Sequence, residues 1–205
     1  MTPIYWKQAQ QELAVQDKIM RRLIQQAGNT ALSSRGDAFT TLARSIVGQQ
    51  ISVKAAESVW QKVIKETPEI TAQALHNSNE NSLRACGLSQ RKVSYLQDLS
   101  RHFIDETWDE AAWNEMDDEA LIAQLIQVKG IGRWTAEMFL IFHMLRPNVL
   151  PLDDIGLQRA ISLHYNTNQP LDKKTIREIA NQWQPWCSVA TWYLWRSLDP
   201  LPVAY

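Results

Sequence analysis

Two adjacent aspartates are the carboxylates best placed in this sequence for catalysis. Asp153 and Asp154 follow the run Leu150-Pro151-Leu152 and immediately precede a predicted helix that begins at Ile155. The dipole and the free N–H groups at a helix N-terminus stabilise a negative charge there. A carboxylate in that position can stabilise a developing cation or activate a water molecule. The same position also suits an ordinary helix cap, so the pair alone leaves both roles open.

A tight turn earlier in the chain is a candidate anion site. A predicted helix ends near Val128, the chain turns at Gly130-Ile131-Gly132, and a second helix restarts at Gly132-Arg133. Glycine accepts positive φ and allows another backbone to come close, so this spacing favours a very short connection between helices. The N–H groups at the start of the second helix suit a phosphate, and Lys129 and Arg133 add positive charge beside it. A plain helical hairpin would show the same glycines.

The composition excludes several classes of function. The 205 residues are 45% hydrophobic and 21% charged, as expected for a globular chain rather than a disordered one. No apolar run approaches the ~20 residues that span a bilayer, and the first residues do not resemble a secretory signal, so we expect no membrane contact and a cytoplasmic location. The net charge of −1 argues against coating nucleic acid by bulk electrostatics, although it allows a local basic face.

Metal chemistry has little support in the sequence. Cys86 and Cys187 cannot form a four-cysteine zinc or iron–sulfur site, and the four histidines lie on separate predicted helices without ligand spacing. The nine tryptophans are the unusual feature of the composition. Such an excess is typical of a packed aromatic core or of stacking on planar ligands.

Helices must position these residues, because apolar side chains recur at intervals of three and four along the chain. Asp37, Ser52 and Ser89 are predicted to cap three of the helices. No segment alternates as a strand does, and we therefore predict an all-α fold. The expected helices cover residues 4–27, 37–48, 52–66, 71–77, 79–86, 89–105, 117–128, 133–145, 155–165, 172–183 and 186–197.

In combination, these motifs resemble the helix-hairpin-helix (HhH-GPD) DNA glycosylase superfamily, in its 3-methyladenine DNA glycosylase II (AlkA-like) branch. The resemblance runs in order from about residue 37 to 197. Trp183–Ala190 is similar to the closing helix of the family. The four stretches that carry the match are Phe39–Ala56, Gly87–Leu96, Val128–Ala136 and Pro151–Gly156.

The resemblance implies two helical lobes that flank a DNA-binding cleft. One lobe is expected at residues 31–149, with the hairpin at 117–145, and the other at 1–30 plus 150–205. The implied partner is double-stranded DNA that contains damaged bases. We expect a monomer, located with the nucleoid or, in a eukaryote, in the nucleus.

The resemblance also assigns residues to roles in base excision. Asp154 matches the catalytic aspartate, and Asp153 shapes the loop. Trp134 and Trp195 match aromatic residues of the base pocket, while Met138 stands where some relatives carry another aromatic residue. An electron-rich ring over a cationic alkylated base contributes ~0.5–2 kcal/mol of cation–π attraction. Both tryptophans could instead serve core packing.

The remaining assignments concern the DNA backbone and the gap left by a flipped base. Gln50 matches the wedge residue, although an apolar wedge is usual and neighbouring Gln49 or Ile51 could take the role. No cofactor is required, but the family often holds a monovalent cation, Na⁺ or K⁺, on hairpin carbonyls, here those of Val128 and Gly130. The expected DNA-binding residues are Lys129, Gly130, Ile131, Gly132, Arg133 and Thr135.

Through the resemblance, the residue type at position 134 predicts which reaction the protein catalyses. Bifunctional relatives carry a lysine there that forms a Schiff base with the sugar, and tryptophan cannot act as that nucleophile. We therefore expect a monofunctional glycosylase for alkylated purines of the 3-methyladenine and 7-methylguanine type, without strand cleavage. Two alternatives remain at this point: a non-catalytic helix-hairpin-helix DNA-binding module, and a mismatch or deaminated-base glycosylase of the same fold.

Overall fold

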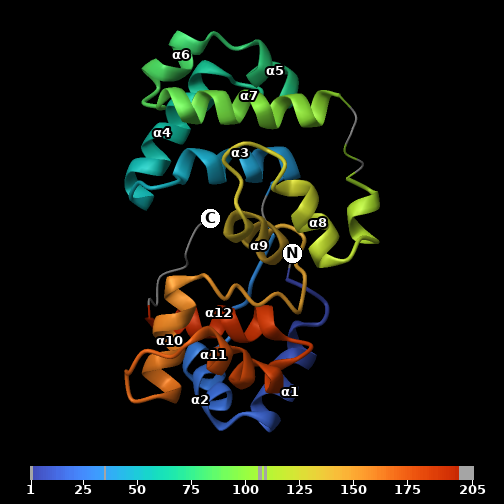
Figure 1. The fold of residues 1–205 in the computed structure, drawn as a ribbon, viewed down its shortest axis with the longest axis vertical. Helices are drawn as coiled ribbons and strands as arrows, with labels where there is room; N and C mark the ends of the chain where they lie inside the picture. The colour runs from blue at the N-terminus through green and yellow to red at the C-terminus, as the bar shows by residue number, and fades with distance from the viewer. Residues whose placement is uncertain (1, 35, 106–107, 109, 199–205) are drawn as a thin grey trace. The chain divides into compact units, whose positions relative to one another are not determined.

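The computed structural model describes residues 2–34, 36–105, 108 and 110–198 (Figure 1). All regular elements within these ranges are helices, which confirms the all-α prediction. The chain divides into two compact units, of which unit 1 joins residues up to Ser34 to those from Leu140 onward, and unit 2 lies between them. The boundaries differ from the predicted ones, because the second falls inside a helix and before residue 149. Residues 199–205 of the predicted second lobe lie outside the described residues.

Unit 1 is built from helices at both ends of the described chain. Helix α12 packs against α1, α2 and α10, so the N-terminal helices complete a core whose other half comes from the C-terminal region. This packing makes unit 1 discontinuous in sequence. Its helices are α1 (Trp6–Gln16), α2 (Lys18–Ala27), α10 (Ile155–Tyr165), α11 (Lys173–Ala180), the 3₁₀ turn η2 (Asn181–Trp183) and α12 (Cys187–Leu198).

Unit 2 is continuous in sequence and is organised around its longest helix, α7 (Gln90–Ile104). Helix α7 packs against α3, α5 and α6, and Figure 1 shows it running beside α3. The predicted caps are confirmed, since Asp37, Ser52 and Ser89 each accept a first-turn N–H group. The other elements of unit 2 are α3 (Ala38–Gly48), α4 (Val53–Glu66), α5 (Ala72–Asn77), α6 (Glu80–Ala85), the 3₁₀ turn η1 (Ala112–Asn114) and α8 (Asp118–Leu125). Helix α9 (Arg133–Phe142) crosses the boundary between the units.

The long helix predicted over residues 4–27 was wrong. Asp17 has an extended backbone (φ −136°, ψ 118°) and separates α1 from α2. Its Oδ1 accepts the N–H groups of Ile19 and Met20 at 2.7 and 3.2 Å, which makes it the N-cap of α2. The break therefore replaces one continuous helix by two that fold back on each other.

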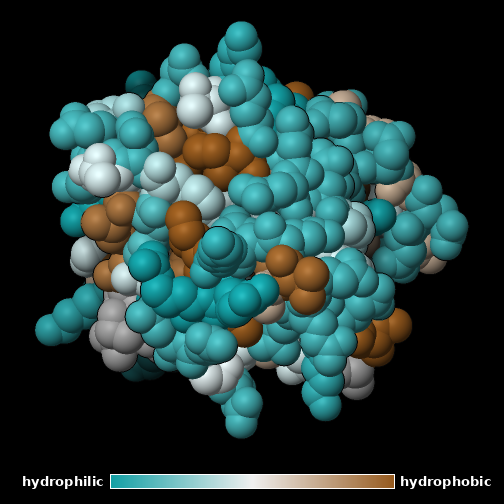
Figure 2. All heavy atoms as spheres, turned by 90° about the horizontal axis from the view of Figure 1, so that it is seen from below, coloured by the Kyte–Doolittle hydropathy of each residue, from teal (hydrophilic) through white to brown (hydrophobic). Residues whose placement is uncertain are grey.

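The face of the molecule seen from below the view of Figure 1 carries no continuous apolar band. In Figure 2, which looks at the molecule from below the view of Figure 1, hydrophilic side chains predominate and the apolar ones form separate patches. Single exposed apolar residues are ordinary on protein surfaces. Among the described residues, no helix is both long and apolar enough to cross a bilayer.

Replacing Asp17 should destabilise unit 1 strongly. The buried Oδ2 of Asp17 also accepts the hydroxyl of Tyr165 at 2.6 Å and Nε1 of Trp183 at 3.0 Å, so Asp17→Ala removes a cap and leaves two buried donors without a partner. We expect a loss of about 3 kcal/mol in the free energy of unfolding, measured by urea titration. Asp172→Ala, which removes the exposed cap of α11, is the matched control and should cost less. Equal losses would contradict the role of Asp17.

Candidate active site and nucleic-acid interface

Asp154 is the N-cap of α10 and is only 7% exposed. Its Oδ1 accepts the N–H of Leu157 at 2.6 Å and Nε1 of Trp195, on α12, at 2.7 Å. Two N–H donors and the positive end of the α10 dipole thus meet on one carboxylate oxygen. The neighbouring Asp153 has a different setting, because it is exposed and paired with Lys173. Of the two candidate carboxylates, Asp154 is the one held in a fixed, buried position.

Trp195 is packed against the carboxylate rather than standing apart from it. Its ring stacks on Phe142 with centroids 5.7 Å apart and planes 11° from parallel. A Cβ added at Gly156 would lie 3.3 Å from Cδ1 of Trp195 and 3.1 Å from Oδ1 of Asp154. Glycine at position 156 therefore allows the indole to come close. The observed contacts assign Trp195 a role in holding Asp154, and its contact with a base stays a prediction.

The hairpin turn has the geometry expected from its two glycines, and they differ in what they do. Gly130 has φ +86°, and a Cβ there would lie 2.2 Å from the ring of Tyr95. A Cβ at Gly132 would meet nothing within 4 Å. The first glycine is required by the fold, and the second leaves open space at the start of α9. The side chains of Ile131 and Thr135 are buried and therefore not available to DNA, and the N–H of Ile131 already donates to the carbonyl of Val128.

The two predicted cations of the hairpin are in different electrostatic states. The guanidinium of Arg133 is paired with Glu119 on α8 and with Glu137 on α9. These contacts raise the pKa of Arg133, and the hydrogen bond from Arg133 lowers the pKa of Glu119. The side chain of Lys129 is 69% exposed, with Nζ 3.9 Å from Asp98. Lys129 is consequently the more accessible charge for a phosphate, and Arg133 joins the two helices of the hairpin.

The loop between α3 and α4 presents the predicted wedge residues. Gln50 is exposed and has φ +58°, a left-handed conformation that is uncommon for residues other than glycine. Ile51 is 41% exposed, so an apolar side chain stands next to it. Gln49 is not available in the same way, because its Nε2 donates to the carbonyl of Gly130 at 2.7 Å. Gln50 and Ile51 are the residues of this loop that remain suited to a wedge.

The same hydrogen bond bears on the expected cation ligands. The carbonyl of Gly130 accepts from Gln49, and the carbonyl of Val128 accepts from the N–H of Ile131 at 3.0 Å. Each oxygen thus has one donor and keeps a second lone pair, so the cation site stays a prediction. Within the described residues, no group of three or more His, Cys, Asp or Glu side chains could hold a metal.

Burial distinguishes the tryptophans that pack in a core from those that could contact a ligand. Eight of the nine tryptophans are at most 9% exposed and belong to the cores of the two units, whereas Trp134 in the first turn of α9 is half-buried. Core packing therefore explains most of the unusual composition, and Trp134 is the exception. Met138, one turn further along α9, is buried.

The predicted site residues are divided between the two units. Asp154 and Trp195 belong to unit 1, while the hairpin turn, Trp134, Met138 and the wedge loop belong to unit 2.

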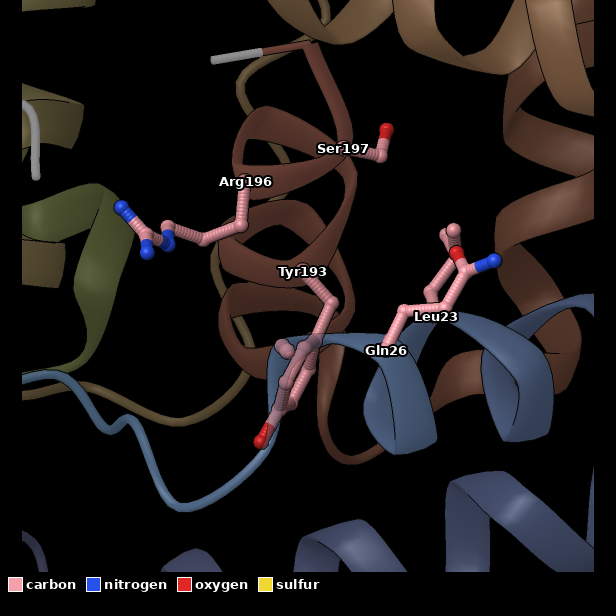
Figure 3. Close-up of a pocket in the computed structure, with 6 residues that line it drawn as sticks. Leu23, Gln26, Tyr193, Arg196 and Ser197 are labelled. Atoms are coloured by element: carbon pink, nitrogen blue, oxygen red, sulfur yellow. The ribbon is translucent and has the colours of Figure 1, made fainter. Parts of the chain in front are cut away.

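A pocket of about 310 Å³ in unit 1 is separate from these residues. It lies between α2 and the C-terminal part of α12, and Figure 3 shows Arg196 and Ser197 projecting to different sides of α12. The predicted site residues are not among the described residues that line it, which are Leu23, Gln26, Ala27, Tyr193, Arg196 and Ser197.

Several residues that hold the site were missed by the sequence analysis. Asp98 on α7 accepts the backbone N–H of Lys129 at 2.8 Å, across 31 positions of sequence. Glu119 and Glu137 pair with Arg133, and Phe142 supports Trp195. None of these belongs to a recognisable motif. The only available signal was helical spacing, which places Glu137 four residues after Arg133.

Comparison with known proteins gives a consistent family assignment. A model described as HhH-GPD superfamily base excision DNA repair protein matches residues 43–185. DNA-3-methyladenine glycosylase 1 of Schizosaccharomyces pombe is 30% identical over 190 residues, which cover 88% of this chain and 82% of that protein. The solved structure of an S. pombe 3-methyladenine DNA glycosylase in complex with abasic DNA superposes with a TM-score of 0.83 at 26% identity, covering 97% of this chain and 99% of that one.

Another relative is longer than this chain. A Bacillus subtilis protein is 30% identical over 169 residues, which are 78% of this chain but 59% of the relative. The chain therefore spans less than two thirds of that relative.

Alanine at Gly130 should lower the stability of the protein, whereas alanine at Gly132 should weaken phosphate binding. Gly130→Ala combines left-handed strain with overlap against Tyr95, and we expect it to lower the free energy of unfolding by about 2 kcal/mol or more. Gly132→Ala meets open space and should change it by less than about 0.5 kcal/mol. The added methyl group should nevertheless weaken phosphate binding at the start of α9. Urea titration and fluorescence anisotropy with duplex DNA measure the two effects, and a strongly unstable Gly132→Ala would refute this distinction.

Proposed function

Because the chain belongs to the HhH-GPD superfamily of base excision DNA repair proteins, we propose that it is a monofunctional DNA glycosylase. Its substrate is an alkylated purine of the 3-methyladenine or 7-methylguanine type in double-stranded DNA. The protein flips this base out of the duplex and hydrolyses the N-glycosidic bond. The names of the S. pombe relatives support this substrate class. The proposal includes a monomeric state and, in the cell, association with the nucleoid or nucleus.

The setting of Asp154 is the observation that carries this proposal. A buried carboxylate held by the N–H of Leu157 and the indole of Trp195 keeps one orientation, which costs no rearrangement during the reaction. An ordinary cap needs only the first of these donors. The second donor and the close packing against Gly156 favour a carboxylate positioned for chemistry.

The reaction follows from this carboxylate and the substrate's own charge. An alkylated purine carries a positive charge, so the bond between its nitrogen and C1′ of the sugar breaks with the electron pair leaving on the base. Positive charge then develops on the sugar, and the carboxylate of Asp154 stabilises it. Water forms the new bond to C1′ and gives up a proton, for which Asp154 is the acceptor. The products are the free base and an abasic site.

The residues of unit 2 bind and open the DNA. The first-turn N–H groups of α9 hold a backbone phosphate, and Lys129 adds charge beside it. Gln50, with Ile51, fills the gap left by the flipped nucleotide. Trp134, the half-buried tryptophan, stacks on the cationic base, and Met138 borders the same surface. Since position 134 holds tryptophan where the bifunctional relatives carry lysine, the reaction ends at base release without cutting the strand.

Asp154→Asn should abolish base release while keeping the fold. The amide oxygen still accepts from Leu157 and Trp195, but the charge is lost, and we expect the single-turnover rate to fall by at least about 100-fold. The measurement is chromatography of bases released from methylated duplex DNA, with the DNA analysed before and after alkali. Strand breaks should appear only after alkali.

Asp153→Asn is the matched control for this variant. Asp153 is the neighbouring carboxylate and pairs on the surface with Lys173, so its loss should leave base release unchanged. A normal rate for Asp154→Asn would refute the catalytic assignment. If the wild-type protein binds duplex DNA without releasing alkylated bases, the chain is either a binding module or a glycosylase for another lesion. Duplexes that contain hypoxanthine, uracil or mismatches separate these two.

Lys129→Gln should weaken duplex binding without regard to sequence. One phosphate contact would be lost, so the slope of log affinity against log salt should decrease by about one. Lys129→Glu should weaken binding further by reversing the charge. Lys65→Gln provides the control, because this exposed lysine lies at the end of α4 that is remote from the wedge loop. An unchanged affinity and salt slope for both Lys129 variants would show that the turn does not hold the DNA backbone.

A further inference from the structure

Three hydrogen bonds close a ring in unit 2 through helix α7. Oδ2 of Asp98 accepts the N–H of Lys129 at 2.8 Å, which ties α7 to the hairpin turn. The carbonyl of Gly130 accepts Nε2 of Gln49 at 2.7 Å, which ties the turn to the wedge loop. The carbonyl of Gln49 accepts Nζ of Lys92 at 2.8 Å, and Lys92 returns the ring to α7. The hairpin turn and the wedge loop are thereby fixed to one rigid element and to each other.

The interior of the ring is filled. The side chains of Lys92, Tyr95 and Asp98 follow each other at intervals of three, which places them along one side of α7 about 4.5 Å apart in rise. Tyr95, the middle one, lies against Gly130 so closely that no Cβ fits between them. The hairpin can therefore neither approach α7 further nor, while the hydrogen bonds hold, move away from it.

The two charged members of the ring are hydrogen-bonded within unit 2, where Asp98 is buried and Lys92 is partly buried. The carboxylate of Asp98 is 8% exposed and also accepts from Arg101. The ammonium of Lys92 donates to the carbonyls of Val47 and Gln49, at the C-terminal end of α3, and burial lowers the pKa of Lys92. Favourable interaction of a cation with a helix C-terminus accounts for the first contact. A lysine used in this way contributes its hydrogen bonds to geometry and not its charge to DNA.

We propose that Lys92 and Asp98 are positioning residues that set the distance between the phosphate-binding turn and the wedge at Gln50. The inference rests on the proposed function. The bound phosphate defines where the hairpin lies on the duplex. The ring fixes Gln49, the residue before the wedge, at a constant distance from the hairpin. Loss of the ring leaves the phosphate site able to bind but lets the wedge shift, and displacements of about 1 Å are sufficient to slow a positioned reaction strongly.

Hydrogen exchange in the DNA-free protein tests the ring without any activity. Lys92 is hydrogen-bonded to the carbonyls of Val47 and Gln49, and Gln49 in turn connects it to the hairpin at Gly130. Lys92→Met should speed amide exchange over residues 126–132, by about fivefold or more, because the loss of one hydrogen bond loosens the others. Lys92→Arg restores a donor and should behave as the wild type, and Lys65→Met controls for the loss of an exposed lysine. If Lys92→Met does not fold, Gln49→Leu cuts the same ring at another bond and takes its place.

Base release provides the second test, through a double-mutant cycle. Lys92→Met and Asp98→Ala, which removes the acceptor of the Lys129 N–H, should each slow single-turnover base release by about tenfold while changing the affinity for undamaged duplex by less than about threefold. In the double variant the rate should stay close to that of the slower single variant, because either change opens the same ring. The fluorescence of 2-aminopurine placed beside an abasic-site analogue should report the same loss of wedge insertion.

The outcomes separate the ring from the enzyme function. Unchanged exchange over residues 126–132 in both Lys92→Met and Gln49→Leu would overturn the ring, as would rate losses that multiply in the double variant. If the wild-type protein releases no base, the proposed function fails, and the exchange measurement still decides whether the ring couples the two segments.

Discussion

The start of a helix leaves backbone N–H groups without partners, and this constraint applies at the starts of both α10 and α9. At α10 the carboxylate of Asp154 satisfies it, so the helix start holds a negative charge of the protein in place. At α9 the preceding residue is Gly132, which has no side chain to offer and leaves space beside the first turn. The same physical feature thus fixes a carboxylate in unit 1 and, in unit 2, leaves the helix start to which we assign a phosphate in our proposal. The surrounding contacts mainly keep these two helix starts where they are.

Local features of the site could be predicted from the sequence, and long-range ones could not. The caps at Asp37, Ser52 and Ser89 and the turn at Gly130 depend on residues within a few positions, and the sequence patterns indicated them correctly. Asp154 was recognisable as a candidate because it precedes a helix. The break at Asp17 depends partly on Tyr165 and Trp183, which are far away in the chain, so the periodicity of residues 4–27 concealed it.

Counting charges also gave an incomplete description of the hairpin. Lys129 and Arg133 look equivalent in the sequence, but only the structure shows that Arg133 is paired with Glu119 and Glu137. Tryptophan content was ambiguous for the same reason, since packing or stacking explains it equally well until burial is known. The resemblance to the superfamily provided the order and role of the motifs, whereas Asp98 belongs to no motif and could be found only from its contact with Lys129.

The discontinuous composition of unit 1 has a consequence for synthesis of the chain in the cell. Helices α1 and α2 are synthesised before unit 2, and their partner α12 follows more than a hundred residues later. At the usual rates of elongation, the apolar faces of α1 and α2 stay without α12 for on the order of ten seconds. Unit 2 is continuous within the described residues and can fold during this interval, so the hairpin turn can form before Asp154 reaches its final surroundings. In the nascent chain, the hairpin of α1 and α2 therefore lacks its larger packing partner until α12 emerges.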